Sequence, residues 1–414
     1  MSSQITTHRF DNDLVLVAEV MPWLESAAFS LLLPIGAAYD PSDRAGLSGL
    51  TCEMSLRGAG ERDSHEFIEA LEDLGVERGE SVSVSHTSLS GATLAENLPE
   101  ALRIYADLLR RPHLPEDQLE AGRLVALQEL RSIEDDPGQK LMMLLRELYY
   151  GQPWGRSSQG DLAGLQAISN EEIRRHVDQF YRPNGLILSV AGNIDWDALK
   201  DLVGELFGDW KAIDAPLPVG DSPGTRIGHV QHDSSQTQIG VAYESVPYRD
   251  DDYFQAWGAV GVLSGGMSSR LFTEVREKRG LCYSVYAANH TLKDRGGVLC
   301  YAGTTAERAQ ETLDVMVAEL VRLGDGVEAG ELNRLKARIK SALIMQQESS
   351  SSRSAAIARD LYHLGRVRTL DELSDIVDAL TCETINAYLA EHPPANFTVV
   401  TLGQQSLETP DGVS

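Results

Sequence analysis

Apolar positions along the chain follow two periodicities, one typical of strands and the other of helices. Aliphatic and β-branched runs at 14–18, 28–33 and 186–193 predict buried strands. In contrast, the segment 116–134 carries leucines three to five positions apart, which predicts a long amphipathic helix. The same criteria predict shorter helices in the first half at 44–54, 66–74, 98–105 and 171–180. They also predict one pair of strands, at 81–85 and 88–94.

The second half of the chain repeats this order of elements, which predicts a duplicated α/β unit. Four consecutive serines, 349–352, interrupt the pattern and predict a helix boundary or loop before a helix at 355–364. The remaining predicted elements are strands at 227–230, 236–243, 281–289 and 298–304, and helices at 253–263, 268–278, 308–323 and 331–347.

A stretch rich in proline and glycine separates the two halves. Residues 210–224 hold three prolines and two glycines between periodic segments, so we expect a linker there. A chain of 414 residues is also too long for one ordinary core. We therefore expect an N-terminal domain at 1–209 and a C-terminal domain at 225–414.

Composition narrows the class of protein. The formal net charge is −26, which argues against nucleic acid as a main partner and leaves basic peptides open. The chain start has no basic-then-apolar leader, and no apolar run is long enough for a membrane span. We expect a cytoplasmic protein with no membrane partner. The chain has four cysteines, none of them in a CxxC pair: Cys52, Cys282, Cys300 and Cys382. We therefore expect no disulfide framework and no zinc ribbon.

The segment 265–286, GGMSSRLFTEVREKRGLCYSVY, carries the clearest candidate chemistry. Its pattern predicts a helix ended by Gly280 and then a strand. Arg276 would lie in the last helical turn and Tyr283 just inside the strand, near one another. A guanidinium and a phenol so placed can bind a carbonyl oxygen and stabilise charge that develops on it. The spacing also fits an arginine that bonds helix carbonyls beside a half-buried strand tyrosine.

The segment AGLSGLTCEM resembles the AGLAHFLEHM segment of the insulinase/pitrilysin zinc metallopeptidases, whose motif is His-x-x-Glu-His. The helix with RLVALQELRSIEDDP resembles the distal helix that supplies that family's third metal ligand, a glutamate. Carried over by position, Gly49 stands for the first histidine, Cys52 for the catalytic glutamate and Glu53 for the second histidine. Glu129 alone survives, while Gly122 occupies the place of a further glutamate.

These replacements predict that this chain has no zinc site of its own. Catalytic zinc needs three protein ligands, and Gly49 has no side chain to offer. A thiol at Cys52 is also a poor general base for metal-bound water. No two histidines fall near an acid on one helix face, and we expect His229 and His232 to be surface residues. We therefore expect the helix at 44–54 to contribute to the packing of the core and not to bind metal.

The C-terminal half resembles the family more closely than the altered metal motif of the N-terminal half does. GGMSSRLFTEVREKRGLCYSVYA resembles the family's C-domain signature, with Gly265 and Gly266 in its loop. Arg276 and Tyr283 match the pair by which that domain contacts substrate near the zinc. The segment FYRPNG and the strand after it extend the resemblance, which covers about residues 8–403.

This resemblance implies an α+β fold of two homologous domains, each a mainly antiparallel sheet with helices packed on one face. It also implies the metal-free subunit of a heterodimeric zinc endopeptidase. In that reading the chain holds no cofactor, and a homologous partner subunit with His-x-x-Glu-His carries zinc and general base. Peptide substrates would add a strand to a sheet edge. The alternative is a catalytically inactive structural or peptide-binding homologue, acting as a homodimer or scaffold.

Overall fold

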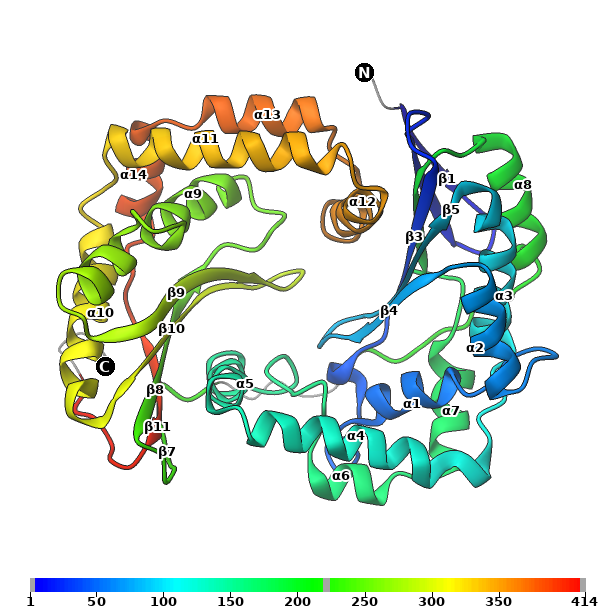
Figure 1. Cartoon of the computed structure of the whole chain (residues 1–414), viewed down its shortest axis with the longest axis horizontal. Helices are drawn as coiled ribbons and strands as arrows, with labels where there is room; N and C mark the ends of the chain where they lie inside the picture. The colour runs from blue at the N-terminus through cyan, green and yellow to red at the C-terminus, as the bar shows by residue number, and fades with distance from the viewer. Residues whose placement is uncertain (1–3, 219–223, 410–414) are drawn as a thin grey trace. The chain divides into compact units, whose positions relative to one another are not determined.

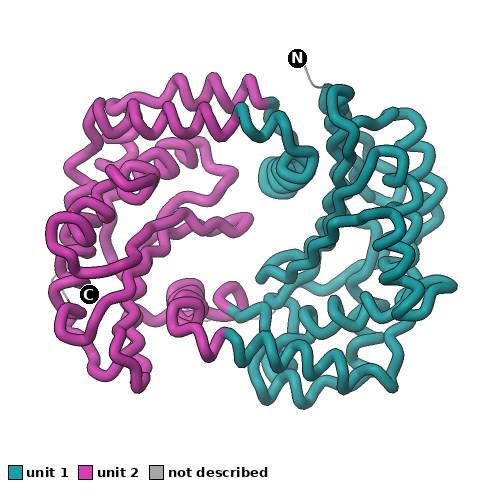
Figure 2. The backbone as a smooth tube through the Cα atoms, viewed as in Figure 1, with its two compact units in different colours: residues 1–132, 156–220, 344–369 teal, residues 133–155, 221–343, 370–414 magenta. Residues whose placement is uncertain are grey.

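The computed structural model describes residues 4–218 and 224–409, whose elements group into two compact units (Figures 1 and 2). Unit 1 comprises residues 1–132, 156–220 and 344–369, and unit 2 comprises 133–155, 221–343 and 370–414. Each unit therefore combines a long stretch from one half of the chain with a short segment from the other half. The expected linker, 210–224, includes residues 219–223, which lie outside the described residues.

A six-stranded mixed sheet forms the centre of unit 1. Its strand order is β1-β2-β6-β3-β5-β4, in which β2 and β6 are parallel and every other neighbouring pair is antiparallel. The strands are β1 (Gln4–Arg9), β2 (Val15–Val20), β3 (Ser26–Leu33), β4 (Glu77–Val82), β5 (Thr87–Leu94) and β6 (Ile187–Gly192).

Helices cover both faces of this sheet. The larger core lies on one face, where Leu16, Leu31 and Leu188 are fully buried against helices of the first half of the chain. On the other face, Val17 and Ile187 pack against Ile357 of α12, a helix from the second half (Figure 1). The unit 1 helices are α1 (Leu47–Ser55), α2 (Ser64–Asp73), α3 (Leu98–Arg110), α4 (Leu119–Glu134, the end of which passes into unit 2), α6 (Leu162–Ala167), α7 (Asn170–Phe180), α8 (Trp196–Phe207) and α12 (Ser350–Leu364).

Unit 2 is built around a five-stranded mixed sheet of order β7-β11-β8-β10-β9, with β7 and β11 parallel. Its strands are β7 (Ile227–Gln231), β8 (Gln236–Ser245), β9 (Cys282–Thr291), β10 (Gly296–Thr305) and β11 (Thr398–Gly403). Its helices are α5 (Pro137–Tyr150), α9 (Tyr253–Ser264), η4 (Phe272–Glu277, a π-helix), α10 (Ala309–Leu323), α11 (Ala329–Gln346), α13 (Leu370–Ala379) and α14 (Cys382–Glu391). Short 3₁₀ turns precede α1, α3, α4 and α10: η1 (Ala37–Tyr39), η2 (Ala95–Asn97), η3 (Glu116–Gln118) and η5 (Ala306–Arg308).

The sheet of unit 2 is also covered on both faces. Ile239, Val241 and Val399 face the larger core with α9, α10 and α11. Leu141 and Leu145 of α5 pack on the opposite face (Figure 1). The segment that carries α5 comes from the first half of the chain, so α5 and α12 are exchanged helices. Each exchanged helix covers the sheet of the unit formed mainly by the other half.

The expected α+β class with two similar sheet-and-helix domains is confirmed. The helices were expected on one face of each sheet, but they cover both faces, because α12 and α5 pack on the second faces. Three local expectations change. The serine run is a helix boundary as expected, with Ser349 as the N-cap, but α12 begins at Ser350, five residues before the predicted start at 355. The predicted strand 81–85 begins earlier, at Glu77. The segment 268–278 forms a π-helix at its centre, since the amide of Lys278 donates to the Thr273 carbonyl five residues back. Across the described parts of the chain, no helix is both long and apolar enough to cross a bilayer.

Candidate functional site

The helix α1 carries the three altered motif positions and is fixed at its N-terminus by a buried carboxylate. Asp40 accepts hydrogen bonds from the amides of Gly46 and Ser48, both at 3.0 Å, and from the Ser48 hydroxyl at 2.6 Å. Gly46 has a φ of 96°, a conformation in which glycine is favoured. Burial raises the pKa of Asp40 to about 6. These contacts set where Gly49, Cys52 and Glu53 lie.

Gly49 and Cys52 cannot serve as a metal ligand and a general base. A Cβ on Gly49 would stand 3.0 Å from the carbonyl oxygen of Ser158, so this face of α1 is closely packed. Cys52 is buried, and burial, with the nearby charges of Glu80, Glu53 and Glu129, raises its pKa to about 12. At neutral pH the thiol therefore stays protonated and takes up no proton.

The third altered position, Glu53, is engaged by an arginine. Its carboxylate accepts from Arg57 Nη2 at 2.7 Å and from Arg57 Nε at 3.2 Å. The place that Gly122 leaves on α4 is filled from α1: a Cβ there would meet Met54 Sδ at 2.7 Å and Arg57 Nε at 3.3 Å. The guanidinium thus brings a positive charge next to the carboxylates that remain.

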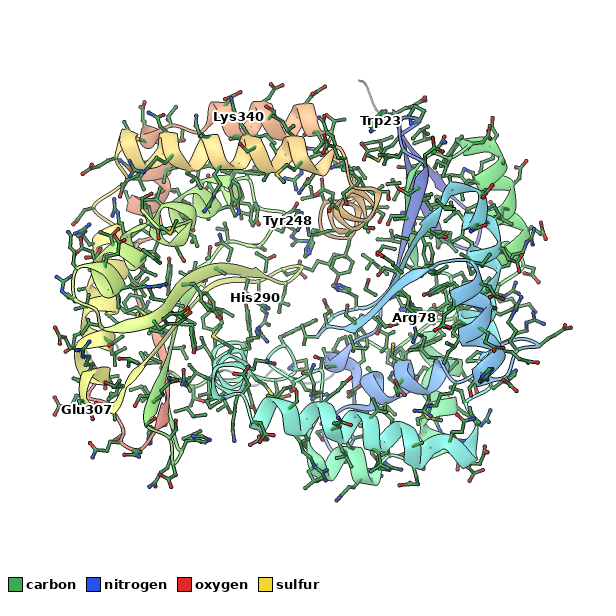
Figure 3. The ribbon with its side chains drawn as sticks, in the orientation of Figure 1. Trp23, Arg78, Tyr248, His290, Glu307 and Lys340 are labelled. Carbon is green, nitrogen blue, oxygen red and sulfur yellow. The ribbon has the colours of Figure 1, made fainter. Side chains whose placement is uncertain are left out.

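Glu129 lies close enough to Glu53 for their charges to interact. The pKa of Glu129 is raised by partial burial and by the charge of Glu53. The pKa of Glu80, on the edge strand β4, is likewise raised by burial despite Arg78 on the same strand (Figure 3). Within residues 4–218 and 224–409, no three His, Cys, Asp or Glu side chains are grouped to hold a metal ion. With Gly49 lacking a side chain and Arg57 paired to Glu53, these residues do not fit catalytic zinc.

In unit 2 the structure brings Arg276 and Tyr283 together. The carbon Cζ of Arg276 lies 4.9 Å from the centre of the Tyr283 ring and 4.7 Å from that of Phe272. Leu271 and Val275 anchor the segment in the core, and Gly280 (φ 60°) makes the turn into β9. The amide of Gly280 donates to the Arg276 carbonyl at 3.0 Å, so the turn holds the arginine backbone in place.

The two side chains of this pair differ in what they leave accessible. Tyr283 is 84% exposed, which leaves its hydroxyl open to a ligand. The guanidinium of Arg276 lies over the rings of both Phe272 and Tyr283. Because hydrogen bonds of a guanidinium leave from its edges, stacking orients the N–H groups without occupying them. In the described part of the chain no carboxylate pairs with Arg276, and its side chain makes no hydrogen bond.

The signature loop lies at the end of α9, beside α11. A Cβ on Gly265 would stand 2.1 Å from the Gly261 carbonyl oxygen and 2.5 Å from Arg338 Nη2, so only glycine fits there. At Gly266 the closest atom is Arg338 Nη1, at 3.5 Å from such a Cβ. The loop therefore passes close beneath the Arg338 guanidinium.

Sequence reasoning missed three residues of these arrangements. Arg57 lies four residues after Glu53, a helical spacing that signals the ion pair. Phe272 has the same spacing from Arg276 and could have been found in the same way. Glu80 has no such signal, because it comes close to Cys52 only through the pairing of β4 with β5.

Comparison with known families and relatives agrees with this architecture. Residues 16–161 match the family described as "Insulinase (Peptidase family M16)", and residues 167–339 match "Peptidase M16 inactive domain". An uncharacterized zinc protease of Rickettsia felis is 26% identical, over 93% of this chain and 94% of the relative. The zinc protease YmxG of Bacillus subtilis is also 26% identical, over 92% and 94%.

Two solved structures share the fold of the whole chain. A peptidase M16 inactive domain from Pseudomonas fluorescens superposes with a TM-score of 0.87 at 21% identity, covering 98% of this chain and 99% of the other. A protease from Helicobacter pylori gives 0.89 at 21% identity, covering 97% and 100%. Together, the two family matches extend from residue 16 to residue 339 with only a short gap. The chain therefore belongs to the insulinase (peptidase M16) family.

Proposed function

We propose that this chain is the non-zinc subunit of a heterodimeric zinc endopeptidase, in which Arg276 and Tyr283 act on the scissile peptide bond. The observation that carries the proposal is their juxtaposition: 4.9 Å from guanidinium to ring, with the phenol exposed. The partner would be a homologous subunit with an intact His-x-x-Glu-His motif. Zinc and the general base would belong to that partner.

The altered motif in unit 1 supports a division of labour between two chains. A protonated thiol stands where the general base would be, and an Arg57–Glu53 ion pair stands beside it. These groups cannot activate a water molecule, since that step needs a carboxylate and a bound metal ion. Hydrolysis by this chain alone is therefore not expected. Arg276 and Tyr283 in unit 2 could therefore act in hydrolysis only if another subunit supplies the activated water.

The chemistry of the pair suits the developing oxyanion. When water attacks a peptide carbonyl, negative charge grows on the carbonyl oxygen. The Tyr283 hydroxyl is free to donate to that oxygen, and the stacked Arg276 can present an N–H edge without first changing conformation. Donors that are already oriented stabilise the transition state more than donors that must reorganise. The π-helical turn that carries Arg276 is a feature often found at functional sites.

Edge strands offer a place for the peptide backbone. In the described sheets, β4 ends the sheet of unit 1 and β9 ends that of unit 2, so each has one side without a neighbouring strand. A peptide that adds to such an edge is held by main-chain hydrogen bonds, which demand little of its sequence. Tyr283 lies on β9 itself, near its N-terminal end.

The test is the substitution Tyr283→Phe in a complex co-purified with a zinc-bearing homologue. The variant should assemble and keep the partner's zinc, because the ring and its stacking on Arg276 remain. We expect kcat to fall by roughly 10²–10³, about 3–4 kcal/mol, as for loss of one oxyanion donor. Arg276→Lys should also lower kcat, since an ammonium cannot reproduce the planar fork.

Tyr286→Phe is the matched control, because Tyr286 is on the same strand, is 40% exposed and stacks on Tyr301. Its kcat should match that of the unmodified complex. If Tyr283→Phe also leaves kcat unchanged in an intact, zinc-loaded complex, the pair has only a structural role. The chain would then be a scaffold or peptide-binding homologue.

A further inference from the structure

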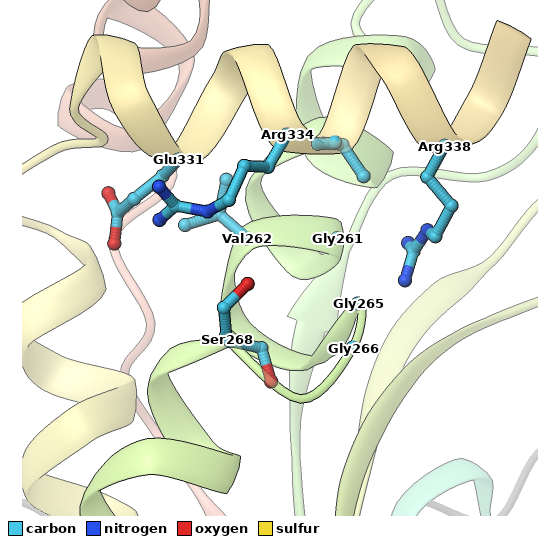
Figure 4. A pocket seen from close by; sticks show the side chains of 10 residues that line it. Gly261, Val262, Gly265, Gly266, Ser268, Glu331, Arg334 and Arg338 are labelled. Atoms are coloured by element: carbon cyan, nitrogen blue, oxygen red, sulfur yellow. The ribbon is translucent and has the colours of Figure 1, made fainter.

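A cavity of about 110 Å³ lies between the signature loop and α11, within unit 2. Gly261, Val262 and Leu335 supply its apolar wall, and the loop residues Gly265, Gly266, Ser268 and Ser269 form the side opposite α11. Figure 4 shows Arg338 extending from α11 toward Gly265 and Arg334 lying along the helix toward Glu331. Two guanidinium groups therefore line the cavity.

The positive charge at this cavity is only partly balanced by the protein, because the charge of Glu331 acts on both Arg270 and Arg334. Its one lining carboxylate, Glu331, is bound in a two-pronged contact by Arg270, with Nε and Nη2 each at 2.8 Å. Within the described residues, neither Arg334 nor Arg338 has a carboxylate within ion-pair distance. Like charges four residues apart on a helix repel one another. Two unpaired arginines so placed, in a chain of net charge −26, indicate that an anion completes the site.

We propose that this cavity is an oxyanion-binding site that takes a single carboxylate or phosphate group. Arg338 would bind the oxygens through its planar fork, and Arg334 would add the second charge. The Ser268 hydroxyl lies on the same cavity and can donate a further hydrogen bond. The amides of Met267 and Ser268 donate to no protein acceptor among the described residues. Serine hydroxyls and main-chain amides are usual partners of bound anions.

The size of the cavity limits the ligand. Pockets for drug-sized molecules or nucleotides are typically about 300–1,000 Å³, so about 110 Å³ suits one anionic group rather than a whole nucleotide. A carboxylate would come from a peptide C-terminus or an acidic side chain, and a phosphate from the free ion. The site is separate from Arg276 and Tyr283 and does not depend on the function proposed for them.

The experiment is calorimetric titration of the intact chain with inorganic phosphate at low ionic strength. We expect saturable binding that weakens by about tenfold or more in Arg338→Gln, since a hydrogen bond to a charged group is lost. Arg131→Gln, which removes an exposed arginine of α4 on unit 1, is the matched control and should bind as the unmodified chain. Arg338 lies over the signature loop without a carboxylate partner, so circular dichroism should show that the variant folds. Arg334→Gln gives a second variant should Arg338→Gln fail to fold.

Competition with a peptide identifies the source of the oxyanion. A peptide with a free C-terminal carboxylate should displace phosphate while its C-terminal amide does not, if a peptide carboxylate is the ligand. Displacement by neither peptide, with phosphate binding still dependent on Arg338, identifies free phosphate. The proposal is overturned if neither phosphate nor the free-acid peptide binds, or if Arg338→Gln and Arg334→Gln bind as tightly as the unmodified chain. Because no zinc subunit or turnover is involved, these outcomes leave the endopeptidase proposal to its own test.

Discussion

Among single residues, Arg57 and Cys52 show why the α1 segment that resembles the family's metal motif does not fit zinc. Three carboxylates, on Glu53, Glu80 and Glu129, affect the pKa of the Cys52 thiol. Unpaired carboxylates in a partly buried place repel one another, and a cation among them relieves that repulsion. Arg57, four residues from Glu53 and only 19% exposed at its side chain, supplies such a cation to Glu53 from α1 itself.

The altered residues of α1 lead to a prediction about zinc binding. The purified chain should hold no stoichiometric zinc, whereas Gly49→His, Cys52→Glu and Glu53→His together should create zinc affinity with Glu129 as third ligand. The new side chain at position 49 must move the Ser158 carbonyl slightly, so we expect weaker binding than in natural zinc enzymes. Metal analysis after dialysis measures the zinc content of the purified chain and of the triple variant.

The matched control for the zinc prediction is the double variant Cys52→Glu with Glu53→His. It keeps position 49 as glycine and should bind no zinc, because only two ligands remain. A folded triple variant without zinc affinity would show that α1 and α4 no longer hold positions 49, 53 and 129 at ligand distance. About one tightly held zinc in the unmodified chain would contradict the prediction directly.

Much of the candidate site was predictable because it depends on local spacing. Arg276 and Tyr283 are seven residues apart across one turn, so their proximity follows from a helix ended by Gly280 and a strand after it. The poor fit of this segment to catalytic zinc could be predicted from Gly49 alone, because glycine has no side chain to bind a metal ion. What could not be predicted is the π-helical winding, since it replaces one backbone register by another with the same side chains.

At the scale of elements, the exchanged helix α12 depends on a buried ion pair. Arg353 Nε donates to Glu19 of β2 at 2.6 Å, and each side chain is 1% exposed. Beside this pair, the Ser189 hydroxyl donates to the Ser354 carbonyl at 2.8 Å. Sequence reasoning predicted α12 but not its place, because periodicity shows that a helix has an apolar face without showing which sheet that face covers.

Removing one partner of the buried pair should destabilise the protein. Arg353→Met should lower the free energy of unfolding by about 3–5 kcal/mol, because Glu19 would remain charged and unpaired inside the protein. Combining Arg353→Met with Glu19→Leu should recover more than half of that loss. Urea unfolding at pH 7.5 provides the measurement, with Arg9→Met as control in the exposed Arg9–Asp13 pair, which should change stability by less than about 1 kcal/mol. The prediction would be contradicted if Arg353→Met lowered the free energy of unfolding by no more than Arg9→Met does.

For the molecule as a whole, one buried histidine, His176, and two part-buried ones, His86 and His290, predict how stability responds to acid. Burial lowers the pKa of His86, His176 and His290 from 6.5 to about 4. Between these values the unfolded chain binds more protons than the folded one, so stability falls as the pH drops from 6.5 toward 4. Each histidine can contribute up to about 3 kcal/mol. Asp40 acts in the opposite sense between about pH 6 and 3.8, because its raised pKa makes the folded state the better proton acceptor there.

Urea unfolding at several pH values tests this dependence. His176→Gln removes one of the three groups, so its free energy of unfolding should vary less steeply with pH between 6.5 and 4 than that of the unmodified chain. Its stability at pH 7.5 should also be lower, since the 3.3 Å contact between His176 Nε2 and the Ser48 hydroxyl is lost. His65→Gln, at an exposed histidine, should leave the slope unchanged. Equal slopes for His176→Gln and the unmodified chain would rule out the buried histidine as a source.

The exchange of segments between units predicts that the two halves of the chain do not fold separately. Fragment 1–218 lacks α12, which leaves Val17, Leu32 and Ile187 on its sheet without cover. Fragment 224–414 lacks α5, and Leu299 and Val400 are then uncovered in the same way. Exposed apolar patches of this kind promote aggregation. Each fragment expressed alone should therefore be insoluble or bind a hydrophobic dye.

Co-expression of the same two fragments supplies both exchanged helices and should restore a soluble complex that co-purifies through a tag on either piece. Adding a peptide of residues 344–369 to fragment 1–218 alone should restore cooperative unfolding, while a peptide with Ile357→Asp should not, because a charge would enter the buried contact with Val17 and Ile187. A soluble, cooperatively folded fragment 1–218 without the peptide would contradict the prediction. Stability here depends on residues more than a hundred positions apart in sequence, because the helix that closes each sheet is encoded in the other half of the chain.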